Sequence, residues 1–279
     1  MLEPFMLSLL ACALVCAFTW IASLVTGNSS WVDRSWSIAP ILYVGIFAGA
    51  AGFTNPTLTV MFWLVTLWGL RLTFNFWRKG GYQRGGEDYR WPVLKARMKP
   101  WQYQVFTVFF IILFQNVLVW SITLPAWVVY DAPRSAFGLT QLVLTLVFLA
   151  LLLFETVADQ QQWNFHQAKA AALKQGKIPE QAFLNTGLFR FSRHPNFFAE
   201  QSQWWVLWVF GVVVTGSVLH WSILGPLVLS ALFIGSTRFT EALTAEKYPH
   251  YKEYQNRTSA IIPWIPERTD KQAAQSASS

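Results

Sequence analysis

Residues 187–200 place basic and polar side chains directly before an apolar run. Pro195 fits the first turn of a helix, where its missing N–H costs nothing, so we expect a helix to begin there. Its free backbone N–H groups and the positive end of its dipole lie next to Arg190, Arg193 and His194. This combination predicts a site for a phosphate or another anionic cofactor group.

Three further side chains continue along the same expected helix. Asn196, Glu200 and Trp204 follow one another at intervals of four residues, which places an amide, a carboxylate and an aromatic ring on one helix face. Such a stripe could hold the polar and aromatic parts of a long cofactor. A simpler interpretation is that Arg193 and His194 anchor a helix end at the lipid headgroups. That interpretation leaves the Glu200 carboxylate unexplained, one turn inside an apolar helix.

Two other segments carry residues suited to a site. Tyr248, Tyr251 and Tyr254 recur every three residues on one side of a carboxyl-terminal helix, where they could line a site or simply pack the helix end. The loop at residues 84–90 combines charges of both signs with two glycines. It could be a folded loop or a lid over a cavity or, equally, a solvated surface loop.

The elements that must position these residues are membrane helices. Of the 279 residues, 54% are hydrophobic and only 13% are charged, where a soluble domain has about 25% charged residues. The mean hydropathy of +0.34 excludes a disordered or fibrous chain. Apolar stretches predict seven spans, at residues 5–26, 37–53, 57–77, 104–123, 138–158, 197–216 and 220–236. The first is not expected to be a cleaved signal peptide, because it is long and has no basic residue before it.

The basic residues predict the orientation of the chain. With the N-terminus outside and the C-terminus cytoplasmic, all of the 21 basic residues except Arg134 fall on the cytoplasmic side. The net charge of +7 is therefore explained by topology, without a nucleic-acid partner. The predicted fold class is an all-α integral membrane protein. Residues 1–266 would form a single transmembrane domain with substrate-side helices at 1–135, a cofactor-binding half at 136–266, and a mobile tail at 267–279.

Several polar pairs interrupt the predicted spans at their inner halves. They are Arg71 and Asn75, Gln115 and Asn116, Glu155 and Asp159, the group of Asn196, Glu200, Gln201 and Gln203, and Arg238 and Glu241. Each pair alone could hydrogen-bond neighbouring helices. Together they favour one polar cavity that opens to the cytoplasm.

The last third of the chain resembles the steroid 5α-reductase superfamily and, within it, a mostly bacterial and poorly characterised branch. The resemblance is carried by Gly187-Leu-Phe, Arg193-His-Pro-Asn196, Glu200, Trp204, Arg238, Glu241, Tyr248 and Tyr251. Similar patterns occur in Δ14 and Δ7 sterol reductases and, more loosely, in isoprenylcysteine and phospholipid methyltransferases. The resemblance implies a multi-pass protein, in a bacterial cell (inner) membrane, whose carboxyl-terminal half binds a nucleotide cofactor from the cytoplasm.

The resemblance implies NADPH as the cofactor. Asn196 directly after His-Pro, with Glu200 four residues on, looks like the reductase pattern and would bind nicotinamide and ribose. The phosphates would bind Arg190, Arg193 and Arg238. The same implied cofactor site includes Asp159, His194, Trp204, Glu241, Tyr248 and Tyr251.

The steroid-binding motif of the reductases, similar to Gln-Leu-Glu-Glu, is absent from the first span. This branch shows Trp36, Arg71, Asn75 and Gln115 instead, which we expect to bind substrate. The resulting hypothesis is an NADPH-dependent oxidoreductase that acts on CH–CH groups. It would deliver hydride to an activated C=C of a lipophilic steroid-like, enone or isoprenoid substrate, with membrane lipid as its other partner and no metal. The proton donor is expected to be Glu87, Tyr89 or Asp33.

Two alternatives remain open. One is a lipid or isoprenylcysteine-type methyltransferase that uses S-adenosylmethionine and tolerates Glu200→Gln. The other is a channel or small transporter built around the polar cavity, which would bind no nucleotide.

Overall fold

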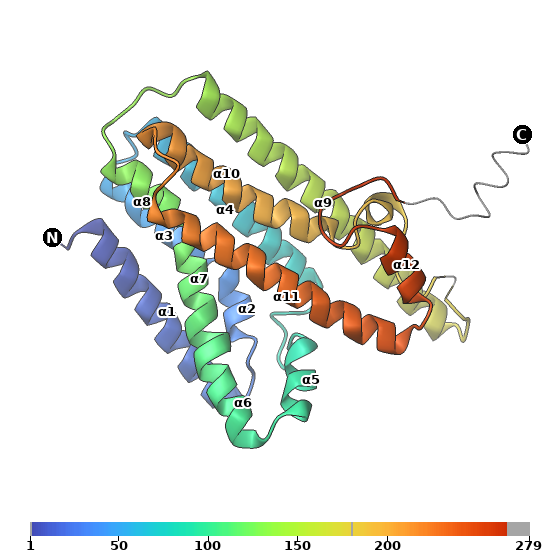
Figure 1. Ribbon diagram of the computed structural model, residues 1–279. Coiled ribbons are helices and arrows are strands. Elements are labelled where there is room, and N and C mark those ends of the chain that lie inside the picture. The colour runs from blue at the N-terminus through green and yellow to red at the C-terminus, as the bar shows by residue number, and fades with distance from the viewer. Residues whose placement is uncertain (1, 180, 267–279) are drawn as a thin grey trace, which may run out of the picture. The chain divides into compact units, whose positions relative to one another are not determined.

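The computed structural model describes residues 2–179 and 181–266, and the tail predicted at 267–279 lies outside them. The described residues form helices and loops, with no strand among them (Figure 1). Five helical segments in this part are long and apolar enough to cross a membrane. They are α1 (Pro4–Thr26), α4 (Pro56–Arg78), the continuous run Pro100–Asp131, α9 (Leu139–Lys174) and the run Trp221–Lys247. These features confirm an all-helical, multi-pass membrane protein.

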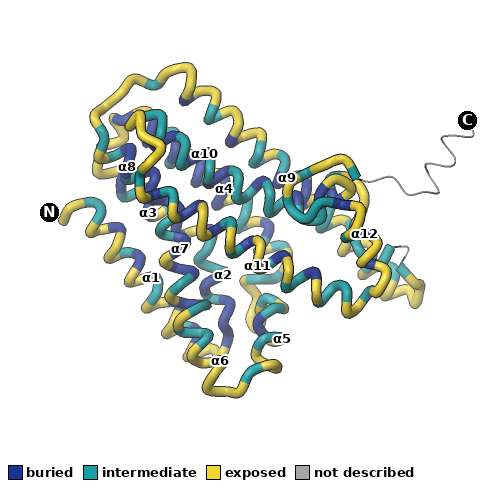
Figure 2. Tube along the Cα trace, viewed as in Figure 1, coloured by how far each residue is buried: buried dark blue, intermediate teal, exposed yellow. Residues whose placement is uncertain are grey.

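Helix α1 has the burial pattern of a lipid-facing helix. Its buried positions are Ser8, Cys12, Thr19 and Ser23, whereas large apolar side chains such as Val25 are exposed (79%), and Figure 2 shows exposed segments alternating with buried ones along α1. Small polar residues at the helix contacts and apolar residues outside reverse the pattern of a water-soluble helix. Lipid is therefore the natural solvent of this face.

Hydrogen bonds join α1 to α7 (Gln115–Ser121). The Asn116 side chain donates to Thr19 Oγ1 at 3.0 Å, and Trp120 Nε1 donates to Ser8 Oγ at 3.1 Å. In an apolar environment such bonds stabilise helix association. For Asn116, the structure thus supports the simpler interpretation of an interhelical contact.

The chain divides into two units. The first unit comprises Met1–Ala150 and Gln203–Ser230, and the second comprises Leu151–Ser202 and Ala231–Ser279. The boundaries fall within α9, α10 (Pro195–Thr215) and α11 (Leu224–Lys247). Each unit is described separately below.

The core of the first unit forms where α3 (Ala39–Ala50) packs against α1 and α4. Tyr43, Phe47 and Trp68 are fully buried there. The remaining elements of this unit include α2 (Trp31–Trp36), α5 (Arg90–Arg97), α6 (Pro100–Phe106), η1 (Thr107–Phe114), α8 (Leu124–Asp131) and η3 (Trp221–Ile223). The wider turn of the π-helical η1 ends directly before Gln115 and resets the register of the polar pair Gln115 and Asn116.

The second unit is built from the ends of three long helices. Helix α9 has 36 residues and is about 54 Å long at 1.5 Å per residue, which exceeds the roughly 30 Å hydrocarbon core. The unit contains the polar end of α9, the start of α10 and the end of α11. It also contains the short helices η2 (Gly187–Arg190), between α9 and α10, and α12 (Tyr251–Arg257), after α11. This unit therefore holds the residues of the predicted anion site.

Two predicted spans have no counterpart among the five long apolar segments. The span predicted at 37–53 corresponds to α3, which has 12 residues, and the span at 197–216 corresponds to α10, which has 21. Helix α10 is not one of the five long apolar segments, because Glu200, Gln201 and Gln203 make its first half polar. The start of α10 at Pro195 confirms the predicted helix start.

Candidate functional site

The turn before α10 is fixed by a glutamine of α9. Gln161 Oε1 accepts a hydrogen bond from Leu188 N at 2.9 Å, and a Cβ on Gly187 would lie 2.5 Å from the same oxygen. Gly187 also has φ +61°, which L side chains rarely adopt. A side chain here would strain the backbone and displace Gln161, so glycine is favoured at this turn, which leads the chain to the basic residues.

The segment before α10 pairs with the chain after α12. The bonds run from Arg193 N to Ser259 O (2.8 Å), from His194 N to Ala260 O (3.0 Å), from Ser192 Oγ to Ile261 O (2.7 Å) and from Trp264 N to Phe191 O (2.9 Å). The two N–H groups directly before Pro195 are thus already bonded to carbonyls. An anion at this end of α10 would depend on side chains more than on these two amides.

Glu241 of α11 gathers the polar groups around the helix start. Its carboxylate accepts from Arg193 Nε at 2.6 Å and Nη2 at 3.0 Å, and from Gln255 Nε2 at 2.8 Å. His194 Nε2 lies 3.1 Å from Glu241 Oε1. The Arg193 and Glu241 side chains are only 10% and 7% exposed, and Arg193 Nη1 also donates to the carbonyls of Gln255 and Thr258. Arg193 therefore ties the carboxyl-terminal segment to α10 and α11.

A pocket of about 420 Å³ adjoins this ion pair. It is lined by Arg193, Ile234, Thr237, Arg238, Glu241 and residues 259–262. This volume lies in the range of small-ligand pockets. We call it the α11 pocket.

Thr237 lines the α11 pocket, and its hydroxyl is buried beneath the pocket surface. It is 3% exposed, and its Oγ1 has no hydrogen-bond partner among the described residues. The next threonines of α11 behave differently: Thr240 donates to Ser236 O at 3.0 Å and Thr244 donates to Thr240 O at 2.9 Å. A buried unpaired hydroxyl is costly, so Thr237 is suited to bond a ligand in the pocket.

Three of the predicted cofactor residues keep their polar groups available. Arg190 and Arg238 are exposed and form no ion pair or hydrogen bond within residues 2–179 and 181–266, and the partly buried Asn196 amide forms none either. The charge of Arg193, in contrast, is balanced by Glu241. Arg238 is therefore the uncompensated cation of the α11 pocket.

The tyrosines after α11 pack around Phe183. The Phe183 ring lies 4.9 Å from Tyr251 and 5.5 Å from Tyr254, and Lys169 Nζ donates to Tyr248 OH at 2.9 Å. Lys169 lowers the pKa of Tyr248, whereas burial raises the pKa of Tyr251. These contacts support the packing role that the sequence left open, and a direct role of Tyr248 and Tyr251 toward a cofactor stays a prediction.

The remaining predicted cofactor residues, Asp159, Glu200 and Trp204, are buried or partly buried. Asp159 of α9 is 5% exposed. Glu200 is partly buried in the second turn of α10. Trp204, one turn further along that helix, lies in the first unit, where its ring is 4.9 Å from Trp68.

The loop at residues 84–90 is folded against the start of α2. Ser29 N donates to Glu87 Oε1 at 2.9 Å, and Arg34 Nη2 donates to Gly86 O at 2.8 Å. A Cβ on Gly86 would lie 2.4 Å from Gly80 O, so the chain requires glycine there. The structure therefore favours a folded loop over a solvated one.

The three predicted proton donors are all found in or beside this loop. Asp33 Oδ2 accepts from Trp91 Nε1 at 2.8 Å, Glu87 accepts from Ser29, and Tyr89 is 59% exposed. Burial raises the pKa of Asp33 above its ordinary value, and neighbouring Asp88 adds to the shift. Asp33 is therefore a carboxyl that holds a proton more readily than usual.

This shift makes the stability of the protein depend on pH. A carboxyl with a higher pKa in the folded state binds protons better when folded, so its stabilising effect declines as pH rises above the unfolded pKa, near 3.8. In Asp33→Asn the amide oxygen can still accept the hydrogen bond from Trp91 Nε1, and the side chain no longer titrates. We expect the Tm of this variant, relative to the unsubstituted protein, to rise between pH 4 and pH 7 in detergent thermal unfolding. Exposed Asp131→Asn is the control, and a difference that shrinks with pH would contradict this account.

The predicted substrate residues lie in the first unit. Trp36 is partly buried and packs against the core cluster that includes Tyr43. Asn75 Oδ1 accepts a hydrogen bond from Arg78 Nε at 2.8 Å, and Gln115 is 5% exposed. Arg71 lies on α4, one turn before Asn75. Their role in binding substrate stays a prediction.

The sequence reasoning missed Gln161 and Thr237. Gln161 fixes the turn at Gly187, and Thr237 supplies the unpaired hydroxyl of the α11 pocket. Thr237 could have been found, because it precedes Glu241 by one helical turn and therefore shares its face. Nothing local marks Gln161, whose partner Leu188 is 27 residues away.

The described helices define a multi-pass helical membrane protein. The chain belongs to a family described as a protein of unknown function, DUF1295, whose profile matches residues 19–258, and this family is in the steroid 5α-reductase-like group. An uncharacterised protein of the fission yeast Schizosaccharomyces pombe is 36% identical over 275 residues, which cover 94% of this chain and 80% of the relative. No solved structure matches the chain. The resemblance is thus confirmed at the level of this group.

Proposed function

We propose that the protein is a membrane-embedded, NADPH-dependent reductase that transfers hydride to an activated C=C of a lipophilic substrate. The observation that carries this proposal is the α11 pocket, which is lined by Arg238, a cation without an ion pair among the described residues, and by Thr237, whose buried hydroxyl has no partner among them. A cation and a buried donor without a partner fit a phosphate group. The pocket volume of about 420 Å³ suits the phosphate-bearing part of a dinucleotide.

The residues next to the pocket would complete the cofactor site. Arg238 would neutralise a phosphate, and Thr237 would donate a hydrogen bond to it. Asn196 and Glu200, on the first two turns of α10, would bind the carboxamide and the ribose hydroxyls. Arg193 would act indirectly, because its ion pair with Glu241 holds the pocket wall at residues 259–262 in place. NADPH, when bound, supplies the hydride.

The proton for the reduced carbon, or for an adjacent carbonyl, would come from the group of three predicted donors, Asp33, Glu87 and Tyr89. Of its members, Asp33 is the carboxyl whose raised pKa favours the protonated form that a donor needs. The partly buried side chain of Trp36 and the buried side chains of Asn75 and Gln115 would line the substrate side. The substrate class is a steroid-like, enone or isoprenoid compound.

The topology forms part of the proposal. Seven spans, an external N-terminus and a cytoplasmic C-terminus place all basic residues but Arg134 on the cytoplasmic side. The α11 pocket would then face the cytoplasmic nucleotide pool. A bacterial inner membrane is the proposed location, although the S. pombe relative shows that similar chains also occur in a eukaryote.

Cofactor binding tests the proposal. We expect NADPH to raise the Tm of the detergent-purified protein, since a ligand at 100 times its Kd stabilises the native state by about 2.7 kcal/mol. S-adenosylmethionine should leave the Tm unchanged. Arg238→Gln and Asn196→Ala should remove most of the shift by NADPH, and Lys252→Gln, an exposed cation of α12 outside the α11 pocket, should retain it.

Other results of this binding experiment would favour one of the two alternative functions. A shift by S-adenosylmethionine alone would overturn the reductase proposal in favour of a methyltransferase. No shift by either ligand would favour the channel or transporter. With a positive NADPH result, oxidation of NADPH in the presence of lipophilic enones becomes the assay for the substrate.

A further inference from the structure

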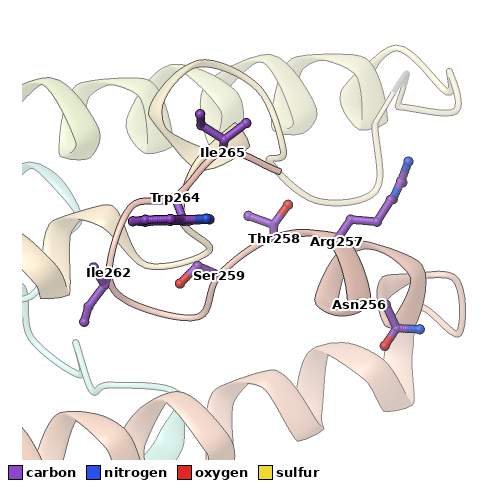
Figure 3. Close-up of a pocket in the computed structure, with 7 residues that line it drawn as sticks. All are labelled: Asn256, Arg257, Thr258, Ser259, Ile262, Trp264 and Ile265. Carbon is purple, nitrogen blue, oxygen red and sulfur yellow. The ribbon is translucent and has the colours of Figure 1, made fainter. Parts of the chain in front are cut away.

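A second pocket, of about 370 Å³, lies in the chain that follows α12 (Figure 3). It is lined by Asn256, Arg257, Thr258, Ser259, Ile262, Trp264 and Ile265. We call it the Trp264 pocket. Its volume is suited to a nucleoside monophosphate and is too small for a complete dinucleotide.

Apolar, hydroxyl and basic side chains follow one another along the Trp264 pocket. Trp264 lies at the apolar end between Ile262 and Ile265, Thr258 and Ser259 lie at the middle, and the Arg257 side chain extends from the far side of Thr258 (Figure 3). A purine base, a ribose and a phosphate follow one another in the same order. Bases stack on aromatic rings, ribose bonds to hydroxyls and guanidinium groups bind phosphate.

The backbone of Trp264 is held in place, whereas its aromatic ring is exposed. Trp264 N donates to Phe191 O at 2.9 Å, so the backbone is fixed beside the start of α10, while the side chain remains 73% exposed. An exposed indole at the pocket wall can stack on a base. The guanidinium of Arg257 is similarly available, since its Nε donates to Glu253 O at 3.2 Å and no other bond of this group occurs within the described residues.

The two pockets are neighbours. Ser259 and Ile262 line both the Trp264 pocket and the α11 pocket. A ligand could therefore extend from Arg238 in one pocket to Trp264 in the other. A dinucleotide, with its phosphates at the centre and adenosine at one end, has this extended form.

We propose that the Trp264 pocket binds the adenosine 2′-phosphate end of the cofactor, with the base stacked on Trp264 and the 2′-phosphate bound by Arg257. This inference rests on the proposed function and adds a specificity: Arg257 makes the protein select NADPH over NADH, which lacks the 2′-phosphate. The phosphates at the centre of the dinucleotide would remain at Arg238 and Thr237.

Equilibrium titration of the full-length protein in detergent with NADPH and with NADH tests this assignment. We expect Arg257→Gln to weaken NADPH binding about tenfold, the effect of losing one phosphate contact, and to leave NADH binding unchanged. Trp264→Leu should weaken both dinucleotides about tenfold, because both carry adenine. Lys252→Gln and the exposed Trp101→Leu are matched controls that should bind as the unsubstituted protein does.

Adenosine 2′,5′-bisphosphate serves as the probe of the adenosine end. It should compete with NADPH more strongly than adenosine 5′-diphosphate does, and this advantage should vanish in Arg257→Gln. Unchanged affinities in both variants, with NADPH still bound, would overturn this inference alone and assign the exposed Ile262, Trp264 and Ile265 to the lipid interface. Failure of the unsubstituted protein to bind either dinucleotide would overturn the proposed function as well.

Discussion

Replacing Glu241 with Leu is expected to destabilise the second unit strongly. The substitution leaves the Arg193 guanidinium, whose side chain is 10% exposed, without its carboxylate, and it removes the acceptor of Gln255. Breaking a buried ion pair from one side costs about 3–5 kcal/mol, which lowers Tm by on the order of 10 °C in a chain of this size. Thermal unfolding in detergent, together with trypsin cleavage after Lys252 and Arg257, measures the effect.

The double variant Arg193→Met, Glu241→Leu separates charge from packing. Because neither charge is then buried alone, part of the lost Tm should return, while the bonds from Arg193 to the carbonyls of Gln255 and Thr258 stay lost. Glu253→Leu, an exposed carboxylate of α12, is the control and should keep the Tm within a few degrees. A double variant no more stable than Glu241→Leu would contradict the ion-pair account and assign the loss to packing or to the other hydrogen bonds of Arg193 and Gln255.

Replacing Glu200 with Gln is expected to weaken NADPH binding by about 10- to 100-fold. A hydrogen bond to a charged group contributes about 1.5–3 kcal/mol, and each 1.4 kcal/mol changes Kd tenfold. The side chain lies in the second turn of α10, one turn after Asn196, where we propose that the ribose binds. Isothermal titration with NADPH measures the change, and NADPH oxidation with a lipophilic enone should fall at least as much.

A matched variant and a stability measurement make the Glu200 result specific. Glu253→Gln removes an exposed carboxylate outside both pockets and should leave Kd unchanged. Thermal unfolding without cofactor shows whether Glu200→Gln still folds. A folded variant with unchanged Kd would contradict a cofactor role for Glu200.

The helical class of the protein and the start of α10 were predictable from local patterns. Apolar stretches interrupted by few charges predicted the long helices, and Pro195 marked the helix start that the structure confirms. The length of α3 was harder to predict. Residues 37–53 are apolar throughout, but α3 has 12 residues, and the segments before and after it form α2 and a turn. Hydropathy records that a segment avoids water and does not fix where the helix ends.

By itself, the sequence determined that the chain is helical, that its solvent is largely lipid, and that basic and polar residues cluster around residue 194. These properties follow from composition and from spacing within single helices. Only the tertiary structure decided that Arg193 is paired with Glu241, whereas among the described residues Arg238 has no ion pair and the buried Thr237 hydroxyl beside the pocket has no partner. The partners in the Arg193–Glu241 pair are 48 residues apart. Which cation is neutralised and which is left for a ligand depends on how α10, α11 and the segment after α12 pack together, and no local pattern encodes that packing.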